Sequence, residues 1–313
     1  MLISVILVSY NTAQMSIEAL NSLFATQGDF TLEVFVVDNA SKDNSAQIIK
    51  NAFPDITLIE NKVNVGFGRA NNQVLDLVKG DFVLLLNTDA FVEVDTLRKT
   101  VEYMLTQPRC GILGVKLLSR DGDLQPSCRY FPTPFNIFAN RVGLNRILPN
   151  IKLVDDENWD PTITQACDWV PGCYYLIRKQ VIDQQGLFDP IYFLYYEEVD
   201  HCFTVKKAGW QVTYFSDASV VHIGGESAKS IGKITTTGRQ LNKLQVESEL
   251  IYFRKNHGLL TCILHLFLII LADGIQTLKN ILRLKFIGLS SFTNSKLMLI
   301  TAWNTRMGLV PLR

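Results

Sequence analysis

The stretch FVLLLNTD has the residue types of a metal and phosphate site. An apolar run from Phe82 to Leu86 ends abruptly in Asn87-Thr88-Asp89. The run is too short for a helix and is typical of a strand buried on both faces. In open α/β sheets, ligands gather at the carboxyl ends of strands, where a carboxylate can bind a hard cation and the cation a diphosphate. We therefore predict Asp89 as a site residue. The alternative is a plain turn, because Asn, Thr and Asp are common turn formers.

A second group of carboxylates, Glu197, Glu198 and Asp200, follows an aromatic stretch and opens a predicted helix. Carboxylates in such a position can take a proton from a substrate. They also interact favourably with the positive end of the helix dipole, so a purely stabilising role is the alternative. In that case the base would lie elsewhere, at Asp168 or in the acidic loop 155–157.

The composition favours a folded chain with a basic tail. The 313 residues suffice for one large domain or a domain with an appendage, and 48% are apolar. The formal net charge is zero. After Asp273 no acidic residue occurs, and the tail carries only basic charges: Lys279, Arg283, Lys285, Lys296, Arg306 and Arg313. This skew favours a tail that faces an anionic surface, although the same side chains could simply be solvated.

The cysteines and the N-terminus indicate a cytoplasmic catalytic part. Six cysteines are scattered without a CxxC pair, so we expect buried thiols in a reducing compartment. The N-terminal MLISVILVSYN lacks the cationic region of a signal peptide and continues directly into a strand pattern.

The first ninety residues alternate between strand and helix patterns. Strands are predicted over 2–8, 32–37, 56–59 and 82–86, and helices over 13–25, 45–52 and 69–78. This order predicts a mostly parallel sheet with crossover helices. A dinucleotide-binding domain requires GxGxxG after the first strand, yet the only GxG, Gly66–Gly68, follows the third. A P-loop is also absent, so the dehydrogenase and NTPase classes are disfavoured.

The rest of the chain has less regular patterns. A helix over 94–107 and a strand over 111–118 precede an irregular segment, 119–163, punctuated by prolines. Further elements are predicted at 173–177, 197–208, 210–215 and 218–222, and mostly helix follows residue 231. The apolar run 259–272 is too short for a comfortable membrane span of about 20 residues. The stretch 278–299 has the composition of a helix lying on a lipid surface.

Five stretches together resemble a known family. They are VILVSYN, VVDNASKDNS, NVGFGRANN, LLLNTD and the pair FLYYEEVDHC and VVHIGGES. In this order they resemble glycosyltransferase family 2, the inverting GT-A enzymes, and look most like its bacterial rhamnosyltransferase-type branch. The resemblance covers residues 1–257. It implies an α/β GT-A fold with a mostly parallel central sheet flanked by helices, followed by a helical, membrane-associating segment over 258–313.

The resemblance also implies the donor site. Asp89 matches the last aspartate of the family's DxD motif and should bind Mg²⁺ or Mn²⁺ that bridges the diphosphate. The first position is Asn87, which lowers the charge of the site. Asp38 matches the aspartate that receives the pyrimidine base, with an Asx-turn as the alternative role. The remaining donor-side residues are Ser9, Asn11, Asn39 and Arg69, and His222 matches a histidine that reaches the metal or diphosphate, with a core histidine as the alternative.

On the acceptor side, the family's base position falls on Glu198, with Glu197 orienting a partner or the acceptor. The pair here is Glu-Glu where the family has Glu-Asp. Trp169, Gly172 and Asp200 match the sugar and acceptor site, although Trp169 could equally serve packing.

The function implied is a membrane-associated, inverting glycosyltransferase at the cytoplasmic face. It would transfer L-rhamnose from dTDP-rhamnose to a saccharide or polyprenyl-diphosphate-linked saccharide during O-antigen or capsule assembly. The alternatives are a UDP-hexose or UDP-galactofuranose donor and a non-catalytic nucleotide-sugar-binding protein. We expect a membrane surface as a partner and no nucleic acid.

Overall fold

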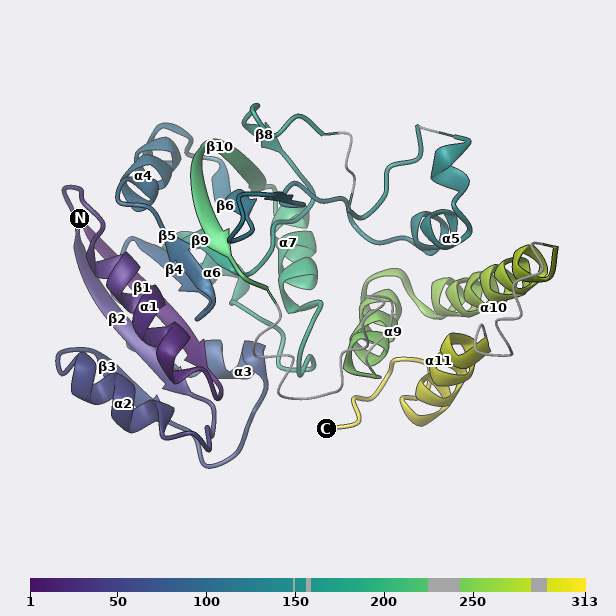
Figure 1. The fold of residues 1–313 in the computed structure, drawn as a ribbon, viewed down its shortest axis with the longest axis horizontal. Coiled ribbons are helices and arrows are strands. Elements are labelled where there is room, and N and C mark those ends of the chain that lie inside the picture. The colour runs from purple at the N-terminus through teal and green to yellow at the C-terminus, as the bar shows by residue number, and fades with distance from the viewer. Residues whose placement is uncertain (149, 156–158, 225–242, 283–291) are drawn as a thin grey trace. The chain divides into compact units, whose positions relative to one another are not determined.

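A computed structural model of the chain describes residues 1–313 apart from 149, 156–158, 225–242 and 283–291 (Figure 1). The chain divides into two compact units. Unit 1 comprises residues 1–129, 157–190 and 197–233, and unit 2 comprises residues 130–156, 191–196 and 234–313. The border that we predict between residues 257 and 258 stays a prediction.

The four predicted N-terminal strands form one half of the sheet in unit 1. They are β1 (Leu2–Ser9), β2 (Thr31–Asp38), β3 (Thr57–Glu60) and β4 (Phe82–Leu86). They lie in the order β3-β2-β1-β4 and are parallel, as predicted. The register pairs Ser9 with Asp38, so the polar ends of β1 and β2 lie at the same edge.

The other half of the sheet contains antiparallel pairs. Strand β9 (Tyr174–Arg178) lies antiparallel between β4 and β6 (Cys110–Leu118), and β10 (Gln211–His222) is parallel to β6 but antiparallel to β5 (Ala90–Val92). The sheet is therefore mixed, whereas we predicted a mostly parallel one. Apolar runs mark buried strands but do not record their direction. Two short strands, β7 (Leu124–Gln125) and β8 (Gln165–Ala166), pair with β6 and β10.

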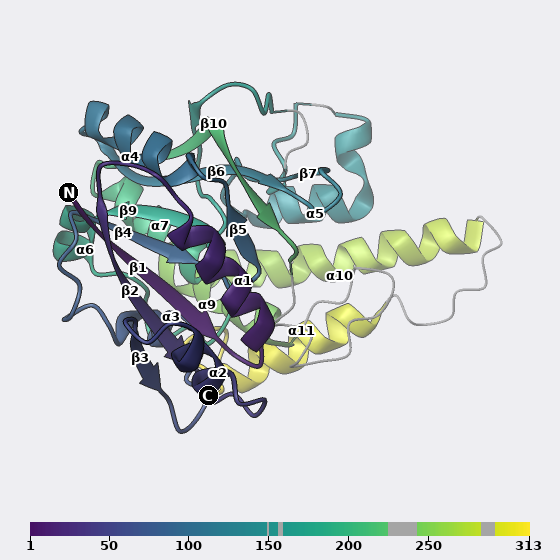
Figure 2. The same cartoon turned by 60° about the vertical axis from the view of Figure 1, so that its left-hand side comes forward.

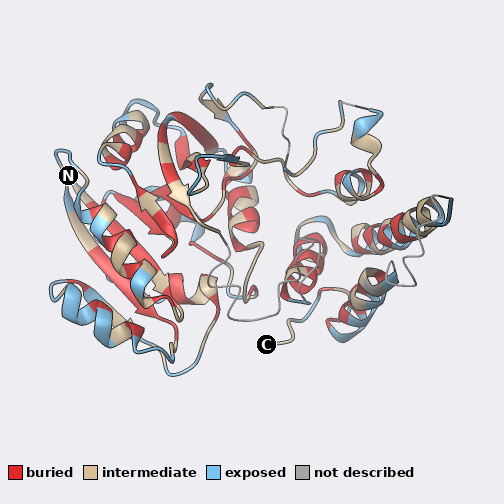
Figure 3. Cartoon of the chain, viewed as in Figure 1, coloured by how far each residue is buried: buried red, intermediate tan, exposed pale blue. Residues whose placement is uncertain are grey.

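Helices cover both faces of this sheet (Figure 2). On one face, alternate residues of the strands pack with α1 (Ala13–Phe24), α2 (Ser45–Ala52) and α4 (Thr96–Thr106). The strands appear almost continuously buried in Figure 3. On the other face, Tyr175 of β9 contacts His201 of α7 (Glu197–Lys207), with its hydroxyl 2.9 Å from the imidazole Nδ1.

Some elements differ from those predicted. Helix α3 (Phe67–Asn72) ends before the predicted residue 78, and β10 is one strand with a register shift between Phe215 and Ser219 instead of two strands. Helices α5 (Pro134–Val142) and α6 (Lys179–Gln185) were not predicted. Helix α5 nevertheless carries start signals in the sequence: a capping box between Thr133 and Asn136, and Pro134 in its first turn.

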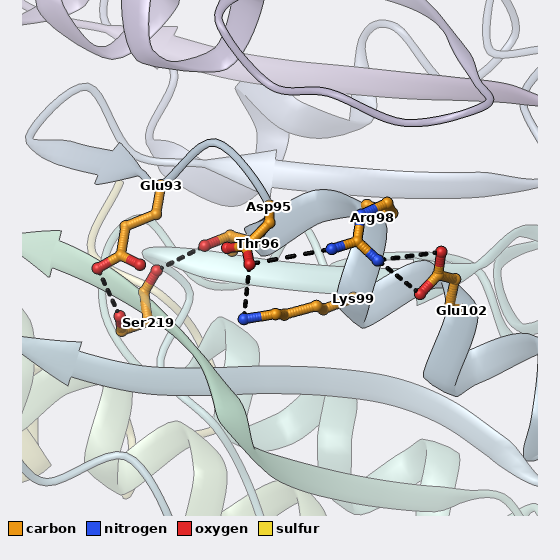
Figure 4. A network of polar contacts seen from close by, with 7 residues as sticks. All are labelled: Glu93, Asp95, Thr96, Arg98, Lys99, Glu102 and Ser219. Carbon is orange, nitrogen blue, oxygen red and sulfur yellow. Dashed lines mark hydrogen bonds and ion pairs between the residues drawn. The ribbon is translucent and has the colours of Figure 1, made fainter.

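The start of α4 is fastened to β10 beside that register shift (Figure 4). The hydroxyl of Thr96 donates to the carbonyl of Ser219 at 2.8 Å, and the hydroxyl of Ser219 donates to Glu93 at 2.8 Å. Exposed ion pairs follow along the helix, including Lys99 with Asp95 at 2.6 Å. Exposed pairs contribute little stability, so the two hydrogen bonds to Ser219 are the specific link.

Unit 2 is helical in its described part. Besides α5, it contains α9 (Lys243–His257), α10 (Leu259–Leu282) and α11 (Thr293–Asn304). Their shared core is formed by Val246, Leu250, Ile269, Met298 and Ala302.

Helix α10 is ten residues longer than the apolar run 259–272 that we judged too short for a membrane span. By length and composition alone it could cross a membrane, and 28% of its most apolar window is buried inside the protein. The continuous apolar run ends at Ala272, but the helix continues beyond it, where Gln276, Leu278, Lys279 and Leu282 are good helix formers. Of the predicted surface helix 278–299, residues 283–291 lie outside the described part.

Candidate functional site

Asp89 lies in the tight link between β4 and β5, as the strand pattern predicts. It is 4% exposed, and its carbonyl accepts a hydrogen bond from the backbone of Ile223 at 3.0 Å. The backbone N–H of Asn87 donates to the carbonyl of Cys173 at 3.0 Å. Burial, together with the Asp89 charge, raises the pKa of the Cys173 thiol to about 12, so this thiol stays protonated. The link therefore presents one fixed carboxylate.

His222, at the end of β10, lies beside this carboxylate. Its Nε2 is 3.6 Å from Oδ1 of Asp89 because β10 pairs with β5, where His222 is opposite Ala90. Burial lowers the pKa of His222, and the positive charge of Arg129 adds to this, while Asp89 opposes it. The imidazole is therefore predominantly neutral near pH 7 and can act as a metal ligand.

The donor set fits a divalent cation shared between protein and substrate. A nitrogen and a carboxylate oxygen 3.6 Å apart can both touch one ion at the usual metal–ligand distances of about 2.0–2.2 Å. Within the described ranges, no group of three or more His, Cys, Asp and Glu side chains gathers for a metal. Among the described residues, Asp89 and His222 would thus provide two ligands and leave positions for other oxygens.

Asp38 ends β2 and is 4% exposed. Its Oδ2 accepts a hydrogen bond from the backbone of Ser41 at 3.0 Å, which is the Asx-turn role considered above. Its Oδ1 is buried without a hydrogen-bond partner. Buried acceptors are normally satisfied, so this oxygen remains able to accept a hydrogen bond from a donor outside the chain. The turn thus explains one carboxylate oxygen and a bound ligand would explain the other.

The other residues predicted on the donor side are held by local hydrogen bonds. Asn11 has a left-handed backbone (φ 53) and accepts from the backbone of Lys42 at 2.7 Å. The side-chain amide of Asn39 stabilises the loop before α3, because its oxygen accepts a hydrogen bond from the backbone N–H of Val65 at 3.0 Å. The Nε of Arg69 donates to the carbonyl of Pro190 at 2.7 Å. The hydroxyl of Ser9, also predicted, lies 3.3 Å from that of Thr12.

The acidic cluster forms the first turn of α7, as predicted. Glu197 is 3% exposed, Asp200 is 2% exposed and Glu198 is half-buried. Burial and the neighbouring Glu198 charge raise the pKa of Glu197 well above its usual range, and one of its carboxyl oxygens has no hydrogen-bond partner. Burial also raises the pKa of Glu198, but the charge of Arg129 opposes this shift. Glu198 is therefore the carboxylate of this pair that is more readily ionised and more accessible.

Arg129 is a candidate site residue that the sequence analysis missed. Its guanidinium lies 4.7 Å from the centre of the Trp169 ring, and its charge acts on both Glu198 and His222. The backbones of Arg129 and Trp169 exchange hydrogen bonds at 3.2 Å. In the sequence Arg129 is a basic residue in an irregular segment. Only its pairing with a residue 40 positions later in the chain, Trp169, reveals its place.

Trp169 itself is 5% exposed, so packing accounts for most of its surface. A Cβ on Gly172 would lie 3.9 Å from the ring of Phe67, in ordinary contact. Asp168, considered as an alternative base, is paired with Lys206 at 2.6 Å. Of the acidic loop 155–157, residues 156 and 157 lie outside the described part.

The mixed sheet with polar groups at its strand ends defines a nucleotide-sugar transferase fold of the GT-A type. The mannosyltransferase PcManGT from Pyrobaculum calidifontis, solved in complex with GDP-Man and Mn²⁺, matches with a TM-score of 0.52. The match covers 98% of this chain and 86% of that chain at 16% identity, so the likeness shows the fold alone. The chain belongs to glycosyltransferase family 2: the family described as "Glycosyl transferase family 2" matches residues 4–159.

Two curated relatives are rhamnosyltransferases. An N-acetylglucosaminyl-diphospho-decaprenol L-rhamnosyltransferase of Mycobacterium tuberculosis is 27% identical over 209 residues, which is 61% of this chain and 66% of the relative. The rhamnosyltransferase WbbL of Escherichia coli K12 is 25% identical over 176 residues, which is 53% of this chain and 63% of the relative. The matches thus span just under two thirds of the length of these relatives.

Proposed function

We propose that this protein is an inverting glycosyltransferase that transfers L-rhamnose from dTDP-rhamnose to a saccharide or polyprenyl-diphosphate-linked saccharide in O-antigen or capsule synthesis. The observation that carries the proposal is the pair of Asp89 and His222, 3.6 Å apart at the strand ends that also hold Asp38. The names of the two rhamnosyltransferase relatives support the donor sugar.

On the donor side, Asp89 and His222 would hold Mn²⁺ or Mg²⁺. When bound, the cation neutralises the charge of the departing diphosphate. Asp38 binds the base through its orphan oxygen, which accepts the imide N–H. Thymine and uracil present the same edge there, so this contact allows dTDP and UDP alike. A UDP-hexose or UDP-galactofuranose donor is therefore the second candidate.

On the acceptor side, Glu198 takes the proton from the attacking hydroxyl. A direct displacement requires this base on the face opposite the leaving diphosphate, which inverts the anomeric configuration. Glu197 is less available as a base because burial and the Glu198 charge raise its pKa well above the usual range and favour the protonated form. Burial raises the pKa of Glu198, and the positive charge of Arg129 opposes this and so favours the ionised form. Trp169, Gly172 and Asp200 are proposed to line the sugar and acceptor side.

A membrane surface is the proposed partner of the C-terminal part, at the cytoplasmic face. The basic tail and the apolar helix α10 support this, since anionic lipids attract Lys and Arg and apolar side chains enter the interface. A polyprenyl-linked acceptor would be located at the same membrane surface.

The decisive experiment is a turnover screen with dTDP- and UDP-sugars, Mn²⁺ or Mg²⁺, and a polyprenyl-diphosphate saccharide. Transfer from dTDP-rhamnose, lost on chelation and in Asp89→Asn, would support the proposal. Binding of nucleotide-sugars without transfer or hydrolysis under all conditions would favour the third candidate, a non-catalytic binding protein.

A further inference from the structure

Gln125, the last residue of β7, makes two hydrogen bonds to one residue far away in the sequence. Its Nε2 donates to the backbone carbonyl of His222 at 2.7 Å, and its Oε1 lies 3.0 Å from Nδ1 of the His222 ring. Strand β7 is only two residues long, and it pairs with β6 through Gln125 and Leu117. This short strand therefore places one amide against both the main chain and the side chain of His222.

The hydrogen bond to the His222 carbonyl determines which end of the Gln125 amide faces Nδ1. A carbonyl oxygen can only accept, so the amide end that faces it must be the NH₂ group. The other end, which faces Nδ1, is then the amide oxygen, and it also can only accept. The Nδ1 of His222 must therefore carry a proton. In the neutral imidazole this leaves the lone pair on Nε2, the atom that lies 3.6 Å from Asp89.

We infer that Gln125 is a positioning residue that fixes His222 in the tautomer and ring orientation needed to bind a divalent cation together with Asp89. This inference rests on the proposed metal site. Metal-bound histidines commonly donate their second ring N–H to such a partner, and loss of that partner typically lowers metal affinity about 10- to 100-fold. Here the partner is a neutral amide, which sets the tautomer without adding a second carboxylate to that of Asp89.

The first test needs no metal and no substrate. The chain has four histidines, so ¹⁵N-labelled histidine gives few signals to assign. In metal-free protein we expect His222 in the Nδ1–H form. In Gln125→Leu we expect it to shift toward the Nε2–H form, which free histidine prefers. An unchanged tautomer in Gln125→Leu, or an Nε2–H form in the wild type, would overturn the inference.

The second test measures Mn²⁺ affinity by calorimetry. Gln125→Leu should bind Mn²⁺ about 10- to 100-fold more weakly than the wild type. Gln125→Glu keeps an acceptor for Nδ1 but loses the NH₂ group that donates to the His222 carbonyl, so it should restore only part of the affinity. Gln165→Leu is the matched control: it makes the same change in β8, the other two-residue strand of this sheet, and should bind Mn²⁺ normally. If Gln125→Leu does not fold, Gln125→Met gives the same comparison with an unbranched side chain.

The outcomes separate this inference from the metal site on which it rests. If Asp89→Asn and His222→Ala both bind Mn²⁺ like the wild type, the metal site is wrong and the inference falls with it. If those variants lose Mn²⁺ while Gln125→Leu keeps full affinity, the metal site stands and the role of Gln125 is wrong.

Discussion

At the residue scale, the two carboxylate oxygens of Asp38 have different surroundings. Oδ2 is satisfied by the backbone of Ser41, while Oδ1 has no hydrogen-bond partner. In Asp38→Asn the amide oxygen can keep the bond to Ser41, but an NH₂ group then faces the base N–H. We expect the donor KM to rise about 10- to 100-fold with a small change in kcat, since base contacts stabilise ground and transition states alike. A large loss of kcat at unchanged KM would contradict this assignment.

Two adjacent glutamates should behave differently in catalysis. Glu198→Gln keeps size and polarity but cannot take a proton, so we expect kcat to fall about 10²- to 10⁴-fold with donor binding unchanged. Glu197→Gln should keep substantial activity because the raised pKa of Glu197 favours its neutral form, which Gln resembles. The measurement is kcat with the true acceptor, alongside donor affinity by calorimetry. If Glu197→Gln is inactive and Glu198→Gln active, the base is Glu197 instead.

The raised pKa of Glu197 also predicts how the stability of the protein depends on pH. Its pKa in the folded protein is raised above the usual value of about 4.5, so the folded state favours a proton that the unfolded chain releases. Its contribution to stability is therefore complete below about pH 4.5 and diminishes as pH rises toward the folded pKa. Glu197→Gln removes the ionisable group, so the variant does not lose stability in this way as pH rises. We expect its melting temperature to exceed that of the wild type at pH 7, with the difference shrinking at pH 4.5. A lower melting temperature at pH 7 would show that the carboxylate is satisfied.

Candidate site residues at strand ends could be predicted from the sequence, whereas those placed by long-range contacts could not. Asp89, Asp38 and His222 each end an apolar run, so their position could be predicted. Gln125 and Arg129 lie in a segment with little periodicity. Their partners are 97 and 40 residues away in the chain, and no local pattern encodes such pairings.

At the element scale, strands were predicted better than their directions. Each of the first three strands is followed by a helix before the next strand begins, and that alternation indicates a parallel arrangement. Strands β5 and β9 have no such alternation: β5 starts directly after the polar end of β4, and β9 returns after the long segment 119–173. Their antiparallel pairing is set by the tertiary fold. It matters for function, because the β5–β10 pair is what brings His222 to Asp89.

The pairing of α5 with α10 predicts a large stability effect within unit 2. Arg141 of α5 forms an ion pair with Asp273 of α10, which is buried and also accepts from the backbone of Ser295 at 3.0 Å. Arg141→Leu leaves a buried carboxylate without its counter-ion, which typically costs about 3–5 kcal/mol. Urea unfolding measures this loss. The exposed pair of Lys179 and Asp183 provides the control: Lys179→Leu should cost less than about 1 kcal/mol. Equal effects would show that the Asp273 site is well solvated.

At the scale of the whole molecule, helix α10 has one face buried in the protein and another that is exposed and apolar. Cys262, His265, Ile269, Ala272 and Asp273 are buried, and His265 lies 2.5 Å from the buried carboxylate of Glu249. Another face is exposed and apolar, at helical spacings of four, three and four residues: Leu260, Leu264, Phe267 and Leu271. A helix with one packed and one bare apolar face is suited to lie in a membrane interface while still holding unit 2 together.

Removal of everything after residue 258 would therefore be an ambiguous test of membrane binding. It would strip α9 of Ile269, Met298 and Ala302, which complete its core. Substitutions on the exposed face avoid this problem, because Leu260 and Phe267 are 81% and 60% exposed and can be changed without opening the core.

The full-length double variant Leu260→Glu/Phe267→Glu should fold normally and bind anionic vesicles at least about 100-fold more weakly. Burying each of these side chains in the interface is worth about 1.5–3 kcal/mol, and the added acidic charges oppose the lipid surface. Leu105→Glu, which changes a 57% exposed leucine of α4 in unit 1, is the matched control and should bind vesicles like the wild type. Co-sedimentation with vesicles rich in anionic lipid measures the binding, and a comparison of low with high salt separates the apolar contribution from the electrostatic one. If the double variant binds vesicles like the wild type, α10 does not contact the membrane. If the wild-type protein never binds them, the membrane surface is not a partner.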